Sequence, residues 1–163
     1  MANKITIGYW GFFHGVGLSS KLACELAGVE YDFKPVMTKE EFYDGLDKTL
    51  DNPFPNLPYI EDGDKIITQS QAIMQYVAYK GGKEHLIGIT PCEKVEQTFL
   101  QGVVGDLKSK FVLKNFGNVN FLAEKEKHYI DIKPFLEKFE KHISGKKFFT
   151  GDQVTMADAS IYL

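Results

Sequence analysis

FPNLPYIEDGDKIITQSQAI, at Phe54–Ile73, combines three local signals. An X-Pro bond, Leu57-Pro58, stands directly before a short β-like run. Asp62-Gly63 is a strong signal for a tight hairpin between that run and Lys65–Thr68. A pattern of helical period then begins at Gln69. The segment therefore predicts a β-hairpin that is followed at once by a helix.

The residues before this segment predict two further strands and two helices. Ile5–Tyr9 alternates as a strand, and apolar residues within Leu18–Leu26 recur at helical spacing. Tyr31–Val36 reads as a second strand, which should lie at a sheet edge because Pro35 cannot donate to a β-ladder. Thr38–Leu50 reads as a short, polar helical segment with a capped start.

A domain boundary is expected at Lys80–Lys83, where two glycines break the helical pattern. The order before it is β-α-β-α-β-β-α, and a right-handed crossover makes the first two strands parallel. This order is the plan of a thioredoxin-like domain, and the pattern beyond it is helical only. We therefore predict a thioredoxin-like domain over residues 1–82, a linker over 83–90 and a partial all-helical domain over 91–163.

Two long helices and the start of a third are expected in this second part. The first begins at Pro91 and runs towards Leu113. The second covers roughly Ala123–Ser144, with a kink at Pro134, and Thr155–Leu163 begins the third. The apolar residues of the first two helices are Val95, Phe99, Leu100, Val103, Val104, Leu107, Tyr129, Ile132, Leu136, Phe139 and Ile143.

The composition of the 163 residues is that of a globular protein, and it argues against several classes of function. A net charge of -3 without a basic stripe argues against nucleic acid, and no apolar run is long enough to span a membrane. The four histidines form no metal-binding pattern, so no metal is expected. Two isolated cysteines and no visible signal peptide suggest reduced thiols and a cytoplasmic location. Cys24 lies at an apolar helical position, which favours a core residue over a reactive thiol.

Three features could form a binding site. If the Leu57-Pro58 bond is cis, the turn exposes the backbone N–H and C=O of Leu57 to a peptide-like ligand. Only about 5 to 6% of X-Pro bonds are cis, but the fold context favours cis here. Gln69-Ser70 opens a helix, so Ser70 is either an N-cap or part of a seat for a carboxylate. Tyr9 ends the first strand, and it either fills the core or rim or donates a hydrogen bond to a ligand thiolate.

Four motifs occur in an order that resembles a cytosolic glutathione transferase, most nearly of the mu class. They are Gly-Tyr-Trp from Gly8, Phe-Pro-Asn-Leu-Pro-Tyr from Phe54, Ile-Thr-Gln-Ser-x-Ala-Ile from Ile67, and Phe-x-Gly-Asp-x-x-Thr-x-x-Asp from Phe149. The resemblance covers the whole chain. It implies a homodimeric enzyme that joins reduced glutathione, as co-substrate, to an electrophilic small molecule without a further cofactor. The last motif contains Thr155–Asp158, which resembles the buried capping box of that family.

The resemblance also implies a set of site residues. Tyr9 corresponds to the catalytic tyrosine that stabilises the glutathione thiolate, and Phe116 to a second tyrosine of the electrophile site. Phe54 is either rim packing or, as the resemblance implies, a plug for a pocket on the partner subunit. Tyr43 and Lys48 are looser matches than the others. The residues implied to contact glutathione are Tyr9, Trp10, Val16, Tyr43, Lys48, Asn56, Leu57, Pro58, Gln69, Ser70 and, reaching across from the other subunit, Asp106.

The chain departs from the family pattern at several places. The segment between Tyr31 and Asn56 is shorter, and Trp10–Gly15 replaces a charged loop. Relatives continue beyond Leu163, so we expect either a fragment or a truncated protein that exposes apolar surface. A non-catalytic binding or structural protein on the same fold stays open as an alternative. A thiol-disulfide redox protein is disfavoured because no cysteine lies at the start of the first helix near Tyr9.

Overall fold

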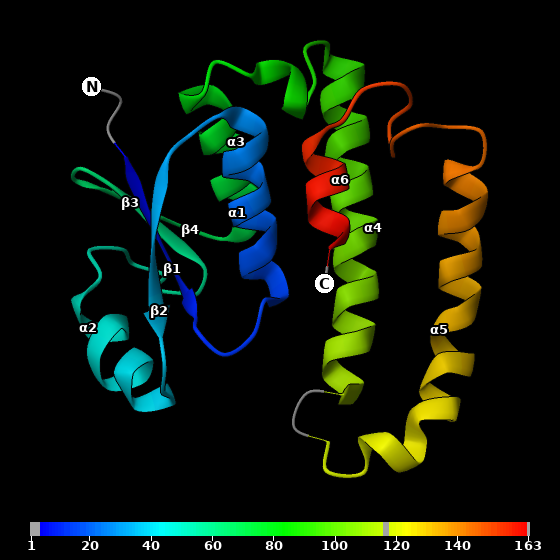
Figure 1. Cartoon of the computed structure of the whole chain (residues 1–163), viewed down its shortest axis with the longest axis horizontal. Helices are drawn as coiled ribbons and strands as arrows, with labels where there is room; N and C mark the ends of the chain where they lie inside the picture. Colours follow the sequence, from blue (N-terminus) through cyan, green and yellow to red (C-terminus); the bar gives the residue numbers. More distant parts are fainter. Residues whose placement is uncertain (1–3, 116–117, 163) are drawn as a thin grey trace.

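A computed structural model describes residues 4–115 and 118–162 of the chain. It consists of a four-stranded sheet and a set of helices that lie beside it (Figure 1). The predicted order of strands and helices, and with it the thioredoxin-like plan followed by helices, is confirmed. The elements are β1 (Ile5–Trp10), α1 (Gly15–Ala27), β2 (Tyr31–Val36), η1 (Glu41–Leu46), α2 (Asp47–Thr49), β3 (Tyr59–Asp62), β4 (Lys65–Thr68), α3 (Ser70–Lys80), η2 (Glu84–Ile87), α4 (Pro91–Asn115), α5 (Phe121–Ile143) and α6 (Met156–Ile161).

The sheet has the strand order β2-β1-β3-β4. β1 and β2 are parallel, whereas β3 is antiparallel to both β1 and β4. β2 is an edge strand and contains Pro35, as expected for a residue that cannot donate to a ladder. The hairpin between β3 and β4 turns at Gly63, whose φ of 64° is in the left-handed region that glycine tolerates.

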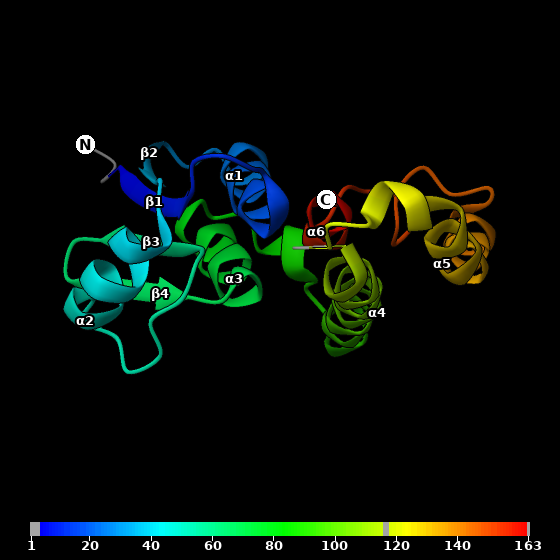
Figure 2. The ribbon, with the colours of Figure 1, turned by 90° about the horizontal axis from the view of Figure 1, so that it is seen from below.

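One face of the sheet carries the main hydrophobic core. α1 and α3 cover this face, and α2 lies on the opposite side of the sheet (Figure 2). Ile5 and Ile7 of β1 and Ile60 of β3 are fully buried there. Cys24 of α1 is also fully buried, which confirms its reading as a core residue, and burial raises its pKa to about 12. At neutral pH this thiol is therefore protonated and unreactive.

Asp62 ties the hairpin to α3. Its carboxylate accepts a hydrogen bond from Tyr76 Oη at 2.6 Å and one from Lys80 Nζ at 2.6 Å. The bonds from Lys80 and Tyr76 lower the pKa of Asp62. In return, the hydrogen bond to Asp62 raises the pKa of Tyr76 to about 12. The network is therefore complete only while Asp62 is ionised and Tyr76 is protonated.

We expect Asp62→Asn to lower the free energy of unfolding by about 1 to 3 kcal/mol near neutral pH. The pKa of Asp62 is lower in the folded chain, so its contribution is present above its unfolded value of about 3.9 and is lost as the pH falls further. The pKa of Tyr76 is higher in the folded chain, so its contribution is lost as the pH rises towards 12. Urea unfolding at several pH values measures the difference, which should vanish in acid. The exposed Asp64→Asn is the matched control, and a deficit of Asp62→Asn that stayed constant into acid would contradict this account.

The helical part has a smaller core of its own. Leu100, Val104 and Leu107 of α4 pack with Phe139 of α5 and Phe149. Val95 and Phe99 lie elsewhere on α4 and are 69% and 61% exposed. The apolar residues of α4 thus occupy two faces, of which only one is covered. α5 passes through Pro134 and bends in its N-terminal half (Figure 1), and its apolar residues Tyr129, Leu136 and Ile143 are exposed.

α6 joins the helical part to the sheet. Met156 and Ala159 belong to the core beneath α1, while the N–H of Ala157 donates to Gln97 Oε1 of α4 at 3.1 Å. The expected capping box is present, because the Asp158 carboxylate accepts the N–H of Thr155 at 2.8 Å. Figure 2 shows α6 between α1 and α4, and α6 contacts both of these helices.

The segment expected as a linker is not extended. It contains η2, and its residues Leu86 and Ile87 are buried in the core of the sheet side. α3 ends at Lys80, directly before the two glycines that suggested a boundary. Where the chain divides into domains therefore stays a prediction.

Candidate active site

Tyr9 lies near the end of β1 with its ring directed towards α1. The alternation of a strand puts it on the same face as Ile5 and Ile7, and its side chain is only 4% exposed. A Cβ atom at Gly17 would lie 2.2 Å from Tyr9 Cδ1, and one at Gly15 would lie 2.5 Å from Tyr9 Oη. The two glycines therefore make room for this ring and its hydroxyl at the N-terminal end of α1.

The surroundings of Tyr9 make its hydroxyl a hydrogen-bond donor. Burial raises the pKa of Tyr9, and hydrogen bonds from the backbone N–H groups of Gly17 and Val16 offset this rise in part. The phenol therefore keeps its proton at neutral pH. Because the two N–H groups bond to the hydroxyl oxygen, they leave the hydroxyl its own proton as a donor.

The loop after β1 carries aromatic side chains. Phe13 meets the ring of Tyr9 edge-on with centroids 5.5 Å apart. Trp10 lies on the other face of the sheet, where its ring is 5.9 Å from Phe42 and 5.5 Å from Phe12. Phe12 is 58% exposed. Tyr9 and Trp10, both predicted to contact the ligand, thus point to opposite faces, as neighbouring residues of a strand must.

The turn before β3 has the predicted backbone form. The Leu57-Pro58 peptide bond is cis, which confirms the expectation from sequence. The backbone N–H of Leu57 donates to Oδ1 of Asn56 at 2.8 Å. Pro58 is buried, whereas Asn56 is exposed. The donor that we expected to be open to a ligand is therefore already bonded to a neighbouring side chain.

Gln69 and Ser70 stand at the start of α3. The N-cap is Gln69, and its C=O accepts the first helical hydrogen bond, from the N–H of Ile73 at 3.0 Å. The reading of Ser70 as an N-cap is therefore wrong, because Ser70 is the first residue inside the helix. Gln69 has a φ of 72°, a conformation that costs a non-glycine residue roughly 1 to 3 kcal/mol. The two residues line a shallow depression together with Gln71, Ala72 and Gln75.

The remaining predicted residues lie on other elements. Tyr43 of η1 is 57% exposed, and Lys48 of α2 forms an exposed ion pair with Asp44 at 3.3 Å. Val16 is in the first turn of α1. Asp106 is exposed on α4, where it borders a shallow depression that also includes Phe99.

Phe54 projects from the loop before β3. Its side chain is 76% exposed, although its backbone is held at both ends. The N–H donates to Asn52 Oδ1 at 2.8 Å, and the C=O accepts from Thr68 Oγ1 at 3.1 Å. A fixed backbone thus presents this ring to solvent. Phe116, the predicted electrophile-site residue, lies outside the described residues.

Several residues of this region were not predicted. Gly17 carried no signal beyond its place in a glycine-containing loop, although the spacing Gly15-x-Gly17 at a helix start is consistent with close approach of another group. Lys108 of α4 reaches across to α1, where its Nζ donates to Ser19 Oγ at 3.4 Å. A single lysine in a long helix gives no sequence signal of such a contact.

Over residues 4–115 and 118–162, we find no group of three His, Cys, Asp or Glu side chains that could hold a metal ion. No helix in these same ranges has both the length and the apolar character needed to cross a membrane.

Comparison with known proteins gives consistent matches over both parts of the chain. Residues 5–79 match the family described as "Glutathione S-transferase, N-terminal domain", and residues 106–163 match "Glutathione S-transferase, C-terminal domain". A class-mu 26 kDa glutathione S-transferase isozyme of Schistosoma mansoni is 32% identical, over 99% of this chain and 80% of that protein. Glutathione S-transferase Mu 6 of Mus musculus is 28% identical, over 97% and 73%. The crystal structure of a glutathione S-transferase from Ascaris lumbricoides superposes with a TM-score of 0.70 at 27% identity, over 97% of this chain and 77% of that one.

Proposed function

The chain belongs to the glutathione S-transferase family, and on this premise we propose that it conjugates reduced glutathione to electrophilic small molecules in the manner of mu-class enzymes. One observation carries the proposal. The Tyr9 hydroxyl is held at the N-terminal end of α1 by two backbone N–H groups, and its proton is left for a ligand. A phenol in this position can donate to a sulfur atom and stabilise its thiolate form.

The energy required is within reach of such a donor. A free thiol has a pKa of about 8.5, so only a few per cent is thiolate at pH 7. Lowering that pKa by about two units takes roughly 2.7 kcal/mol of preferential stabilisation of the anion. A hydrogen bond to a charged acceptor contributes about 1.5 to 3 kcal/mol. Tyr9 alone could therefore provide most of the activation of the glutathione thiol.

The rest of the proposed glutathione site is taken from the family resemblance, and the chemistry of two segments supports it. Gln69 and Ser70 stand where the free N–H groups and partial positive charge of α3 favour the carboxylate of the γ-glutamyl end. Asn56, Leu57 and Pro58 would hold the cysteinyl backbone by β-like pairing. The other residues that we assign to the site are Trp10, which follows Tyr9 in the chain but points to the opposite face, Val16 in the first turn of α1, Tyr43 and Lys48 towards the glycyl end, and Phe116 for the electrophile.

We further propose a homodimer in which Asp106 of one subunit reaches the glutathione of the other. The uncovered face of α4 supports this idea, because it combines exposed Val95 and Phe99 with Asp106 at the border of one depression. The exposed ring of Phe54 is suited to fill a pocket on the partner. If the uncovered α4 faces of two subunits pack together, they remove apolar surface from contact with water.

Phe54→Ser should weaken the dimer, because a fully buried phenylalanine side chain contributes about 1.5 to 3 kcal/mol at an interface. This corresponds to an increase of about 10- to 150-fold in the dissociation constant. Sedimentation velocity over a range of micromolar concentrations measures it. Leu122→Ser, at another highly exposed apolar residue, is the control. If the dissociation constant of the Phe54→Ser dimer equals that of the parent, Phe54 does not fill a pocket on the partner, and rim packing is its only role.

We propose a cytoplasmic location and no cofactor beyond glutathione as co-substrate. The two cysteines support the first point, because they are unpaired, as expected for a reducing compartment. We also keep the division into a glutathione-binding domain over residues 1–82 and a helical domain over 91–163.

Two measurements on the same preparation test the proposed function. Calorimetry with reduced glutathione measures binding, and turnover of a chromogenic aryl halide measures conjugation. The proposal predicts that the chain binds glutathione and that it conjugates glutathione to the aryl halide. Binding without turnover would point instead to a non-catalytic binding or structural protein on this fold, and no binding would exclude both functions.

A further inference from the structure

A cavity of about 430 Å³ lies where η2, the N-terminal end of α4 and the loop before α6 come together (Figure 1). Its volume is within the range of small-molecule sites. None of its lining residues is among those assigned to glutathione, so it is separate from the site at Tyr9. The lining residues that determine its chemistry are His85, Ile89, Glu93, Glu96, Gln97 and Asp152.

Two carboxylates in the wall of this cavity have no cationic partner. Glu96 of α4 is half-buried and Asp152 of the loop before α6 is exposed. Over residues 4–115 and 118–162, neither of them forms an ion pair. Glu93 is different, because its Oε2 already accepts the backbone N–H groups of Ile89 and Thr90 at 2.8 Å each. The wall therefore offers two negative charges that nothing in the described chain neutralises.

Gln97 adds a buried hydrogen-bond donor to the same wall. It is only 5% exposed, and its Oε1 accepts the N–H of Ala157 at 3.1 Å. This bond fixes which end of the amide is the oxygen, so Nε2 carries two N–H groups at the other end. No described residue accepts a hydrogen bond from Nε2.

The cavity is where this amide nitrogen meets solvent. Among the described residues, Ser20 Oγ and Tyr59 Oη are the buried side-chain atoms that have neither a hydrogen-bond partner nor solvent contact. Gln97 Nε2 is not one of them, so it keeps solvent contact, and Gln97 lines this cavity. Buried polar groups are normally hydrogen-bonded, so an unused donor at the wall of a cavity points to a ligand that carries an acceptor.

These groups together favour one class of ligand. The two carboxylates require positive charge, and the amide of Gln97 requires an acceptor. A metal ion does not fit, because no described group of three His, Cys, Asp or Glu side chains could hold one. An organic ammonium group needs no such coordination shell, and the exposed side chain of Ile89 offers apolar surface to the rest of the molecule.

We propose that this cavity binds a small organic ammonium compound that carries a hydrogen-bond acceptor close to its charge, as amino acid amides do. The ammonium group donates to the carboxylates of Glu96 and Asp152. The acceptor takes a hydrogen bond from Gln97 Nε2, and the apolar part lies against Ile89. The site does not depend on the proposed function, since it shares no residue with the glutathione site.

Three matched probes test this assignment. Leucinamide has the ammonium group and the acceptor, isopentylamine lacks the acceptor, and N-acetyl-leucinamide lacks the charge. A ligand of this size should bind with a Kd on the order of 1 mM. Isopentylamine should bind about 3- to 10-fold more weakly than leucinamide, because it leaves the Gln97 donor unused. N-acetyl-leucinamide should bind at least about 10-fold more weakly, because the bonds to the carboxylates lose their charge.

Nuclear magnetic resonance on the nitrogen-15-labelled chain measures these affinities near pH 7, where an α-amino group is mostly protonated. The side-chain amide of Gln97 is the reporter, and its signal is identified by its absence from Gln97→Met. Leucinamide should shift this signal in a saturable manner. If no saturable shift occurs at concentrations well above about 1 mM, the cavity holds water only and the proposal is overturned.

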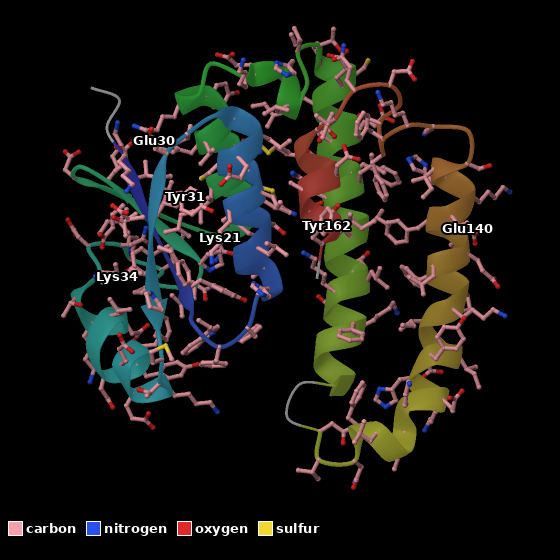
Figure 3. All side chains as sticks on the ribbon, viewed as in Figure 1. Lys21, Glu30, Tyr31, Lys34, Glu140 and Tyr162 are labelled. Carbon is pink, nitrogen blue, oxygen red and sulfur yellow. The ribbon has the colours of Figure 1, made fainter. Side chains whose placement is uncertain are left out.

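Glu96→Gln tests the carboxylate, because it keeps the shape of the side chain and removes its charge. We expect the Kd of leucinamide to rise about 10-fold. Glu140→Gln is the matched control, since Glu140 is exposed on α5 and does not line the cavity (Figure 3). Its Kd should equal that of the unmodified chain. An unchanged Kd in Glu96→Gln would overturn the assignment.

Gln97→Met tests the donor. Leucinamide and isopentylamine should then bind equally, as followed through the backbone N–H of Thr155 in the cavity wall. Gln101→Met is the control, because Gln101 is also 5% exposed and lies one turn further along α4 without lining the cavity. It should keep the preference for leucinamide. If Gln97→Met fails to fold, the two amines decide in the unmodified chain, where equal affinities would overturn the proposal.

Discussion

Tyr9→Phe should reduce the conjugation rate about 25-fold near pH 7, and the deficit should shrink to about twofold at pH 8.5. These values follow from a thiol pKa of about 6.5 when the hydroxyl donates and about 8.5 when it does not. At pH 7 the bound thiol is then mostly ionised in the parent and only a few per cent ionised in the variant. At pH 8.5 both forms are at least half ionised, so the advantage of the hydroxyl nearly disappears.

Aryl halide turnover between about pH 6 and 9, together with calorimetry for glutathione, measures this effect. Phenylalanine retains the ring that lies against Gly17, so the affinity for glutathione should change little. Tyr79→Phe is the matched control, because this tyrosine is exposed near the end of α3. A deficit of the same size at every pH would show that Tyr9 acts on something other than the ionisation of the thiol.

Gly17→Ala should cause a loss of activity comparable to that of Tyr9→Phe, and it should also destabilise the fold. The added Cβ would lie 2.2 Å from Cδ1 and 2.4 Å from Cγ of Tyr9. These ring atoms are next to the backbone of β1, so the ring cannot swing aside without moving the strand. Overpacking of this kind typically costs about 1 to 3 kcal/mol, although alanine would gain about 1 kcal/mol in helix propensity.

The control for this variant is Gly45→Ala, because an added Cβ there meets nothing within 4 Å. Urea unfolding and the conjugation assay are run on both variants and on Gly17→Ala combined with Tyr9→Phe. If Gly17 acts by positioning Tyr9, the double variant should be no less active than either single variant, since the same interaction is lost only once. Fully additive losses would assign Gly17 an independent role.

The features that could be predicted from the sequence depend on local chemistry. Pro35 cannot donate to a ladder, so its strand had to lie at an edge. Asp62-Gly63 supplies a residue that tolerates the left-handed region, so the hairpin turns there. The cis Leu57-Pro58 bond and the capping box at Thr155 could also be predicted from short motifs, once the fold was known.

The features that could not be predicted depend on contacts between distant segments. Lys108 of α4 and Ser19 of α1 meet although they are 89 residues apart, and α6 contacts both of these helices. Gln69 has a positive φ where β4 leads into α3, and glutamine has no local preference for this conformation. The periodicity of α4 shows which residues are apolar, but not that Leu100 faces a core while Phe99 faces outward. That difference depends on which helices pack against α4.

The hydrogen bond within the turn before β3 has a consequence for how the site discriminates between ligands. In the free protein the N–H of Leu57 is already bonded to Oδ1 of Asn56. A ligand carbonyl that takes this N–H replaces one acceptor by another, and the number of hydrogen bonds is unchanged by the exchange. Such an exchange adds little to affinity, but a ligand that displaces Asn56 without offering an acceptor leaves a donor unpaired and binds about 1 to 3 kcal/mol more weakly. In the proposed site the turn would therefore favour ligands that offer a peptide carbonyl over ligands that displace Asn56 without one.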